Sequence, residues 1–455
     1  MISEEFIMQR ITDMTSGNIT RQILRFAFPL IIANIGQQLY MIVDASIVGL
    51  GVGVKALAAV GSTDWSYWLI LWTVMALTQG FATFVSRYFG KQDFENLRKS
   101  IAMSVILCLI IGASLTVVGF FAARPVLELL KTPSDIIDSA ETYLLTMISG
   151  TLIVASYNMS ASILRAFGDG RSPLIAMIIA AILNIALDLT FVLLFDMGIF
   201  GAALASVIAQ FVSFLYCFHQ IKKIEYAKLT REDFRIDAKM IKELLVFGIP
   251  LALEHIVIAL GGIVLQSTIN AQGSIFVAGY TATNKLYGLL ECTAIALGMA
   301  FSTFSSQNFG AGNKKRVIEG IRKGTALTVG IATAIALFFI SLGKYMLRLF
   351  IDTKETGANE ALKIAYDYLL IMTFFLIVLY LIHVYRNVMQ AMGISVWSMV
   401  SGFSEFVVRV CMAKLIIPII GSNGIFYTEP LAWIAALLFI FIPFLYYKKK
   451  LLLRI

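Results

Sequence analysis

The sequence predicts an all-α polytopic membrane protein whose twelve transmembrane helices form two pseudo-symmetric six-helix bundles. Three observations predict this fold class: an apolar composition, twelve apolar runs of spanning length, and a repeat that relates the two halves. Of the 455 residues, 59% are hydrophobic and only 14% are charged, whereas soluble domains carry about 25% charged residues. Polar side chains are too few to cover a globule of this size, which excludes an ordinary soluble enzyme.

The twelve apolar runs predict the transmembrane helices directly. Each run is long enough to cross the hydrocarbon core of a bilayer, which takes ~20 residues of α-helix. The runs cover residues 23–50, 56–88, 100–123, 136–164, 172–196, 199–221, 243–269, 276–306, 320–343, 361–390, 396–420 and 430–447. The only long polar connection between them is 222–242.

A repeat relates the first six runs to the last six. Residues 81–101 (FATFVSRYFGKQDFENLRKSI) correspond to residues 301–321 (FSTFSSQNFGAGNKKRVIEGI) at an offset of 220, and FAFPL at 26–30 corresponds to FGIPL at 247–251. LRAFG at 164–168 corresponds to MQAMG at 389–393. Six spans separate each pair, so counterparts lie on the same side of the membrane, as in a parallel repeat. We therefore predict an N-lobe at 1–221, a cytoplasmic linker at 222–242 and a C-lobe at 243–455.

Basic residues predict the orientation, because Lys and Arg near helix ends are enriched on the cytoplasmic side. The connections on one side carry Arg87, Lys91, Arg98, Lys99, Arg165, Arg171, Lys222, Lys223, Lys228, Arg231, Arg235, Lys239, Lys242, Lys314, Lys315, Arg316, Arg322 and Lys323. The opposite connections carry only Lys55, Arg124, Lys131, Lys344, Arg348, Lys354 and Lys363. We expect a multi-pass protein of the cell (inner) membrane with both termini in the cytoplasm. The net charge of +8 is then a topology signal, and no nucleic-acid partner is expected.

Motifs for catalysis are missing from the sequence. It contains no GxxxxGK[ST] phosphate loop, no HExxH and no GxSxG. The four cysteines lie singly in apolar stretches, which predicts neither a disulfide framework nor a zinc site. Two related bundles without such motifs are typical of an alternating-access transporter. We expect no enzyme activity and no cofactor other than a coupling ion.

Two acidic residues lie inside the predicted spans of the N-half, Asp44 in LYMIVDASIVG and Asp188 in NIALDLTFVLL. Asn184 lies one turn before Asp188 on the same helical face. No Lys or Arg lies inside these spans away from their ends, so the two carboxylates are expected to take up protons, bind a cation, or do each in turn. Oxygen ligands of this kind suit Na⁺ or H⁺. The alternative is that each acid only hydrogen-bonds nearby backbone or water.

The rise of an α-helix places Asp44 roughly 30 Å and Asp188 roughly 23 Å along their helices from the cytoplasmic end. Both side chains are therefore expected in the outer half of the membrane.

Charges in the C-half balance each other. Glu254, Lys285, Glu291, Glu405, Arg409 and Lys414 sum to zero. Glu405 and Arg409 have the i,i+4 spacing of a helical ion pair. At the repeat offsets, Leu265, Arg409 and Ala413 stand where the N-half has Asp44, Asn184 and Asp188, so the cation site is not duplicated. Glu254 is a possible second proton or substrate site, with a structural pair to Lys285 as the alternative.

These features resemble the multidrug and toxic compound extrusion (MATE) transporters, in particular their bacterial branches. The resemblance is carried by the twelve spans, by QQLYMIVDASIVG and by ILRAFGDGRSP followed by NIALD. It implies an N-lobe cation site in which Asp44, Asn184 and Asp188 are joined by the backbone carbonyl of Ala202 and by the hydroxyl of Ser206. Ser206 replaces the threonine expected there. Pro29 stands where the first helix of the family bends.

The resemblance implies a Na⁺- or H⁺-coupled antiporter that exports organic, often cationic, compounds. Its partners would be these small molecules and the lipid bilayer, and the chain is expected to be a monomer. A flippase for lipids or lipid-linked precursors, from the same superfamily, is the alternative. A flippase is expected to have a cationic central cavity, and the N-half lacks the basic residues for one.

We predict that the linker at 222–242 tolerates cleavage, because it is polar and joins two related halves. The two halves, co-expressed as separate chains, should assemble and transport. Failure of the pair to assemble, measured by co-purification, would argue against two self-contained lobes.

Overall fold

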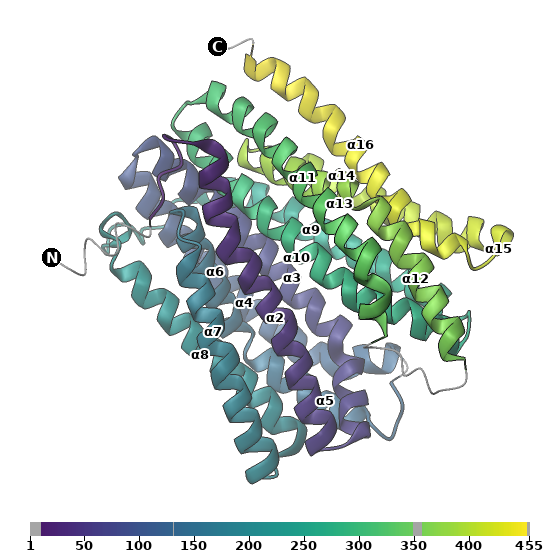
Figure 1. The fold of residues 1–455 in the computed structure, drawn as a ribbon. Coiled ribbons are helices and arrows are strands. Elements are labelled where there is room, and N and C mark those ends of the chain that lie inside the picture. The colour runs from purple at the N-terminus through teal and green to yellow at the C-terminus, as the bar shows by residue number, and fades with distance from the viewer. Residues whose placement is uncertain (1–10, 131, 349–356, 453–455) are drawn as a thin grey trace. The chain divides into compact units, whose positions relative to one another are not determined.

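The structure is a computed structural model that describes residues 11–130, 132–348 and 357–452, and within these ranges the chain is helical with no strand (Figure 1). Lys131 and Lys354, as well as both ends of the chain, lie outside the described residues. The chain divides into two compact units. Unit 1 contains the segment before Thr15 together with Phe28–Ala252, and unit 2 contains Thr15–Ala27 together with the chain from Leu253. The predicted lobe boundaries at 221 and 243 remain a prediction.

Unit 1 is built from six spans, two of which are interrupted. Its elements are α2 (Ile19–Gly51), α3 (Val54–Lys91), α4 (Phe94–Leu129), α5 (Ile137–Ser149), α6 (Thr151–Ala166), α7 (Arg171–Asp188), the π-helix η1 (Leu189–Leu194), α8 (Gly198–Lys222) and the short 3₁₀-helix η2 (Glu225–Ala227). The helix α9 (Ala238–Asn270) begins in unit 1 and continues in unit 2.

Unit 2 repeats this order of elements. After α9 come α10 (Ser274–Gly310), α11 (Lys314–Leu347), α12 (Ala358–Phe374), α13 (Leu376–Ala391), α14 (Val396–Cys411), the π-helix η3 (Met412–Ile416), α15 (Ile417–Ile420) and α16 (Gly424–Leu452). In both units the fourth span is bent, by 45° between α5 and α6 and by 48° between α12 and α13. In both units the fifth span also runs into a π-helix.

Within the described residues, nine helices are long and apolar enough to cross a membrane, and the two bent pairs raise this number to eleven. The remaining predicted span, 396–420, corresponds to α14, η3 and α15. This span is not among the eleven because a π-helix interrupts it and because it contains the charged residues Glu405, Arg409 and Lys414. The helices expose large apolar side chains, such as Phe121 (75% exposed) and Leu194 (77% exposed), as expected for surfaces that face lipid.

The linker is packed onto unit 1, which its polar composition did not predict. Asp233 is buried, accepts hydrogen bonds from the backbone and side chain of Thr230 at 2.7 and 2.8 Å, and lies 3.5 Å from Arg98 of α4. The rings of Tyr226 and Phe94 stack with their centroids 4.4 Å apart. The segment is therefore held along α4 by specific contacts.

The turn before α7 combines a glycine and a buried cap. Gly168 has a φ of +79°, and a Cβ atom there would lie 2.3 Å from the backbone oxygen of Thr12. Only glycine fits both the left-handed backbone and this contact. Asp169 follows and accepts hydrogen bonds from the backbone N–H groups of Arg171 and Ser172, both at 2.9 Å. Asp169 thereby satisfies donors at the start of the helix that carries Asn184 and Asp188.

We predict that Asp169→Ala lowers the stability of the protein, because it leaves the first N–H groups of α7 without acceptors. Loss of such a cap costs about 1 kcal/mol, and more when the group is buried. Asp169→Asn retains an oxygen acceptor and should lose less. Thermal unfolding of the purified variants measures the difference, and equal loss in both would contradict the capping role.

Candidate cation site

Three helices of unit 1 bring the predicted site residues together. Asp44 lies near the end of α2, Asn184 and Asp188 lie in the last turns of α7, and Ser206 lies in the middle of α8. Asn184 and Asp188 are fully buried, and Ser206 is nearly so. Packing of α7 directly against α8 places their facing side chains at hydrogen-bond distance.

Asn184 connects Asp188 to Ser206 through hydrogen bonds. In the amide orientation that satisfies its neighbours, Nδ2 donates to a carboxylate oxygen of Asp188 at 2.7 Å, and Oδ1 accepts from the N–H and the hydroxyl of Ser206 at 3.1 and 3.2 Å. In a regular α-helix the Ser206 N–H would bond to the carbonyl four residues earlier, that of Ala202. Asn184 competes for this donor, and the role of the Ala202 carbonyl as a cation ligand stays a prediction.

The two carboxyl groups, of Asp44 and Asp188, lie within hydrogen-bond reach of each other. Neither forms an ion pair with a Lys or Arg in the described part of the chain. One oxygen of each, Oδ1, is buried and has no hydrogen-bond partner. Two adjacent acids in an apolar helix bundle cannot both ionise without a counter-ion. The arrangement therefore fits one monovalent cation or one shared proton.

Two features near the acids could not be read from the sequence pattern. The π-helix η1 begins immediately after Asp188, and such distortions are common at functional sites because they shift the backbone hydrogen-bond register. Tyr40, one turn before Asp44, places its hydroxyl 3.4 Å from that of Ser206. Tyr40 thus joins α2 to α8 beside the acids.

Pro29 lies inside α2, and Pro250 lies at the corresponding place inside α9. Each proline removes one hydrogen bond from its helix, which makes that point the easiest place for the helix to bend. The two units of the chain also divide close to these prolines, after Ala27 and after Ala252.

Glu254 of α9 forms an ion pair with a residue that the sequence argument overlooked. Its partner is Arg386 of α13, at 3.2 Å. The sequence had offered Lys285 as the partner of Glu254 in a structural ion pair. Arg386 also bonds to Glu405, and the predicted i,i+4 pair of Glu405 with Arg409 is present at 3.1 Å. Arg386 lies within the apolar run at 361–390. A basic residue inside a predicted span is the signal by which the sequence could have identified it as a partner for a buried acid. The role of Glu254 as a proton or substrate site stays a prediction.

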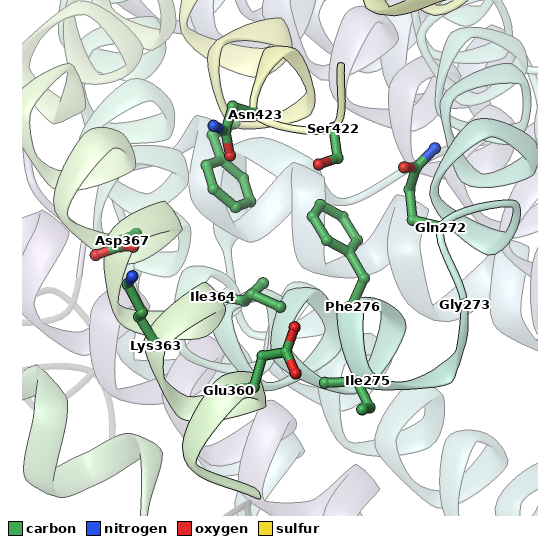
Figure 2. Close-up of a pocket in the computed structure, with 11 residues that line it drawn as sticks. Gln272, Gly273, Ile275, Phe276, Glu360, Lys363, Ile364, Asp367, Ser422 and Asn423 are labelled. Atoms are coloured by element: carbon green, nitrogen blue, oxygen red, sulfur yellow. The ribbon is translucent and has the colours of Figure 1, made fainter. Parts of the chain in front are cut away.

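Unit 2 also contains a pocket of about 590 Å³ between the start of α10, the start of α12 and the loop before α16. Figure 2 shows Phe276 of α10 and Glu360 of α12 next to each other at this space, with Asn423 above them. The ring of Phe276 stacks on that of Phe426, with 5.6 Å between centroids. The pocket lies at helix ends predicted to face outward, and none of these four residues was singled out from the sequence.

Comparison with known proteins identifies relatives over both halves. A family model described as MatE matches residues 29–190 and 250–415. The probable multidrug resistance protein YpnP of Bacillus subtilis (strain 168) is 31% identical over 348 residues, which are 76% of this chain and 78% of YpnP. The probable multidrug resistance protein YoeA of the same organism is 26% identical over 450 residues, 96% of each chain.

Solved structures share the fold over nearly the whole length. A crystal structure of MATE in complex with MaL6 has a TM-score of 0.88 at 22% identity and covers 96% of this chain and 98% of that chain. An outward-facing multidrug resistance MATE family transporter of the MOP superfamily has the same TM-score, identity and coverage. The likeness confirms the predicted all-α polytopic fold class of twelve helices.

Proposed function

We propose, from the premise that this chain belongs to the multidrug and toxic compound extrusion (MATE) family, that it exports organic, often cationic, compounds in exchange for Na⁺ or H⁺. The matched relatives are named as probable multidrug resistance proteins, which supports export of small molecules, and we propose that this export proceeds by alternating access. We place the chain in the inner membrane as a monomer, with both termini in the cytoplasm. No cofactor other than the coupling ion enters the proposal.

The observation that carries the proposal is the pair formed by Asp44, which is partly buried, and Asp188, which is fully buried, neither of which has a Lys or Arg partner among the described residues. A carboxylate buried in an apolar bundle costs several kcal/mol unless a charge or proton compensates it. Asp44 and Asp188 each keep a buried oxygen without a hydrogen bond. The Ser206 hydroxyl and the Ala202 carbonyl would add neutral oxygen ligands, which suit Na⁺, and Asn184 positions Asp188 and Ser206 through its hydrogen bonds. A shared proton would satisfy the same two carboxylates.

The coupling that we propose works through α2. When both acids are ionised they repel each other, so the approach of α2 to α7 is unfavourable. A bound Na⁺ or a shared proton removes that repulsion and favours a bent α2, with Pro29 as the bending point. The bent form would reduce the cavity of the N-half and expel the drug. A cation shifts this equilibrium only through its different affinity for the two forms, so drug and cation oppose each other.

The flippase alternative is less favoured. A lipid-linked pyrophosphate would need cationic side chains in the transport path, and among the described residues no Lys or Arg pairs with Asp44 or Asp188. The matched relatives are also named for drug resistance. If the purified protein bound an anionic lipid precursor more tightly than an organic cation, the flippase function would be favoured over drug export.

We predict that Asp44→Asn abolishes dye export by cells while the protein still folds and inserts. The amide keeps the size of the side chain but can neither bind a proton nor carry the charge that attracts Na⁺. Asp138→Asn is the matched control, because the Asp138 carboxylate is 85% exposed and lies outside the site. Dye efflux at the wild-type rate, at equal expression, would contradict the assignment of Asp44.

Drug and cation should weaken each other's binding. We expect Na⁺ or acidic pH to reduce drug affinity roughly 5- to 150-fold, the usual range for coupled sites, and Asp188→Asn to remove the effect. Isothermal titration of purified protein, at low and high Na⁺ and at acidic and alkaline pH, measures it. Unchanged affinity under all conditions, or an undiminished effect in Asp188→Asn, would refute the coupling.

A further inference from the structure

The guanidinium of Arg409 is nearly buried in unit 2 and is surrounded by oxygen acceptors. It bonds to both carboxylate oxygens of Glu429, at 3.0 and 2.7 Å, to Glu405 at 3.1 Å, and to the backbone carbonyl of Ile258 at 3.4 Å. The Arg409 side chain is only 8% exposed and that of Glu429 15%. Two-pronged contacts of this kind are the strong form of a charged hydrogen bond.

Among the acids of unit 2, Glu429 depends on Arg409 for its counter-ion. Arg386 already compensates Glu254 and shares Glu405. Glu429 has no ion-pair partner other than Arg409 in the described part of the chain. Removal of Arg409 would therefore leave Glu429 as a nearly buried carboxylate without a counter-ion.

The partners of Arg409 come from the same three helices of the repeat that form the N-half site. There α2, α7 and α8 supply the ligands, and here α9, α14 and α16 supply them. The correspondence is local as well. Both α7 and α14 run into a π-helix, and α8 and α16 both begin with Gly-Ile-Phe. At the repeat offset, Arg409 takes the position of Asn184.

The C-half has room for the Arg409 side chain beside the residue that corresponds to Tyr40. Gly261 of α9 is the counterpart of Tyr40 in α2. A Cβ atom on Gly261 would lie 3.1 Å from Cδ of Arg409 and 3.3 Å from the backbone of Phe406. A tyrosine there would occupy the volume that the arginine stem fills. Leu265, the counterpart of Asp44, supplies no acid.

We propose that the C-half contains a counterpart of the N-half cation site in which the guanidinium of Arg409 is a permanently bound, covalently attached cation. Such a cation cannot exchange with the medium, so the corner between α9, α14 and α16 stays closed whatever the Na⁺ concentration or pH. Ion exchange is confined to the site of Asp44 and Asp188. The comparison with the N-half rests on the proposed function, whereas the binding of Arg409 by Glu429 and Glu405 does not.

The test is chemical rescue of the purified full-length chain, followed by thermal unfolding without drug or transport. Arg409→Ala should lower the unfolding midpoint, and millimolar propylguanidinium chloride should restore most of the loss, because the soluble guanidinium can occupy the vacated carboxylate site. Wild type and Arg322→Ala, which removes an exposed arginine, should not be stabilised. Arg409→Ala combined with Glu429→Gln should lose the rescue.

A propylguanidinium response in Arg409→Ala no larger than in wild type would overturn the proposal. If Arg409→Ala does not fold, the comparison moves to Arg409→Gln alone and combined with Glu429→Gln. The double variant removes both charges and should be the more stable of the two, whereas equal stability would overturn the proposal. Repeating the rescue in the Asp44→Asn background separates the outcomes, because failure of the N-half coupling leaves the Arg409 response unchanged.

Discussion

The cost of placing a charge inside an apolar helix bundle is the constraint on which the rest of this structure depends. Every ionisable group in the spans needs a counter-ion, a proton or water. In unit 2, Arg386 and Arg409 form direct ion pairs with Glu254, Glu405 and Glu429, which leaves one of the three negative charges for a proton or water to balance. In the described part of unit 1, no Lys or Arg pairs with Asp44 or Asp188. We propose that their compensating charge comes from the medium as a coupling ion.

Duplication followed by divergence explains how one fold contains both arrangements. The bent fourth span and the π-helix in the fifth span occur in both units, so this backbone geometry is a property of the repeat. The side chains differ: acids and Asn184 in one half, and Arg409 with its acidic partners in the other. In our proposal, the half held by internal ion pairs remains rigid, while its counterpart responds to an external cation.

The sequence predicted the helices and the repeat because both depend on local hydrophobic pattern. It also predicted the Glu405–Arg409 pair, whose spacing lies within one helix. It missed the pairing of Glu254 with Arg386, because which basic side chain reaches an acid depends on the packing of separate helices. The helix break at Phe375, the π-helices and the anchoring of the linker through Asp233 were missed for the same reason: each is decided by tertiary contacts. The sequence related Asp44 to Asp188 through their expected depth and the lack of basic residues in the N-half spans, and it related Asn184 to Asp188 through helical spacing. The full set with Ala202 and Ser206 came from the family resemblance.

The central claim is that an external cation, bound by Asp44 and Asp188, drives drug export. The most direct test uses proteoliposomes of the purified protein with drug on one side and an imposed Na⁺ gradient, then an imposed H⁺ gradient. The account predicts that at least one gradient drives drug uphill in wild type and that neither does so in Asp188→Asn. Uphill transport by Asp188→Asn at the wild-type rate, or no response of the wild type to either gradient, would contradict it.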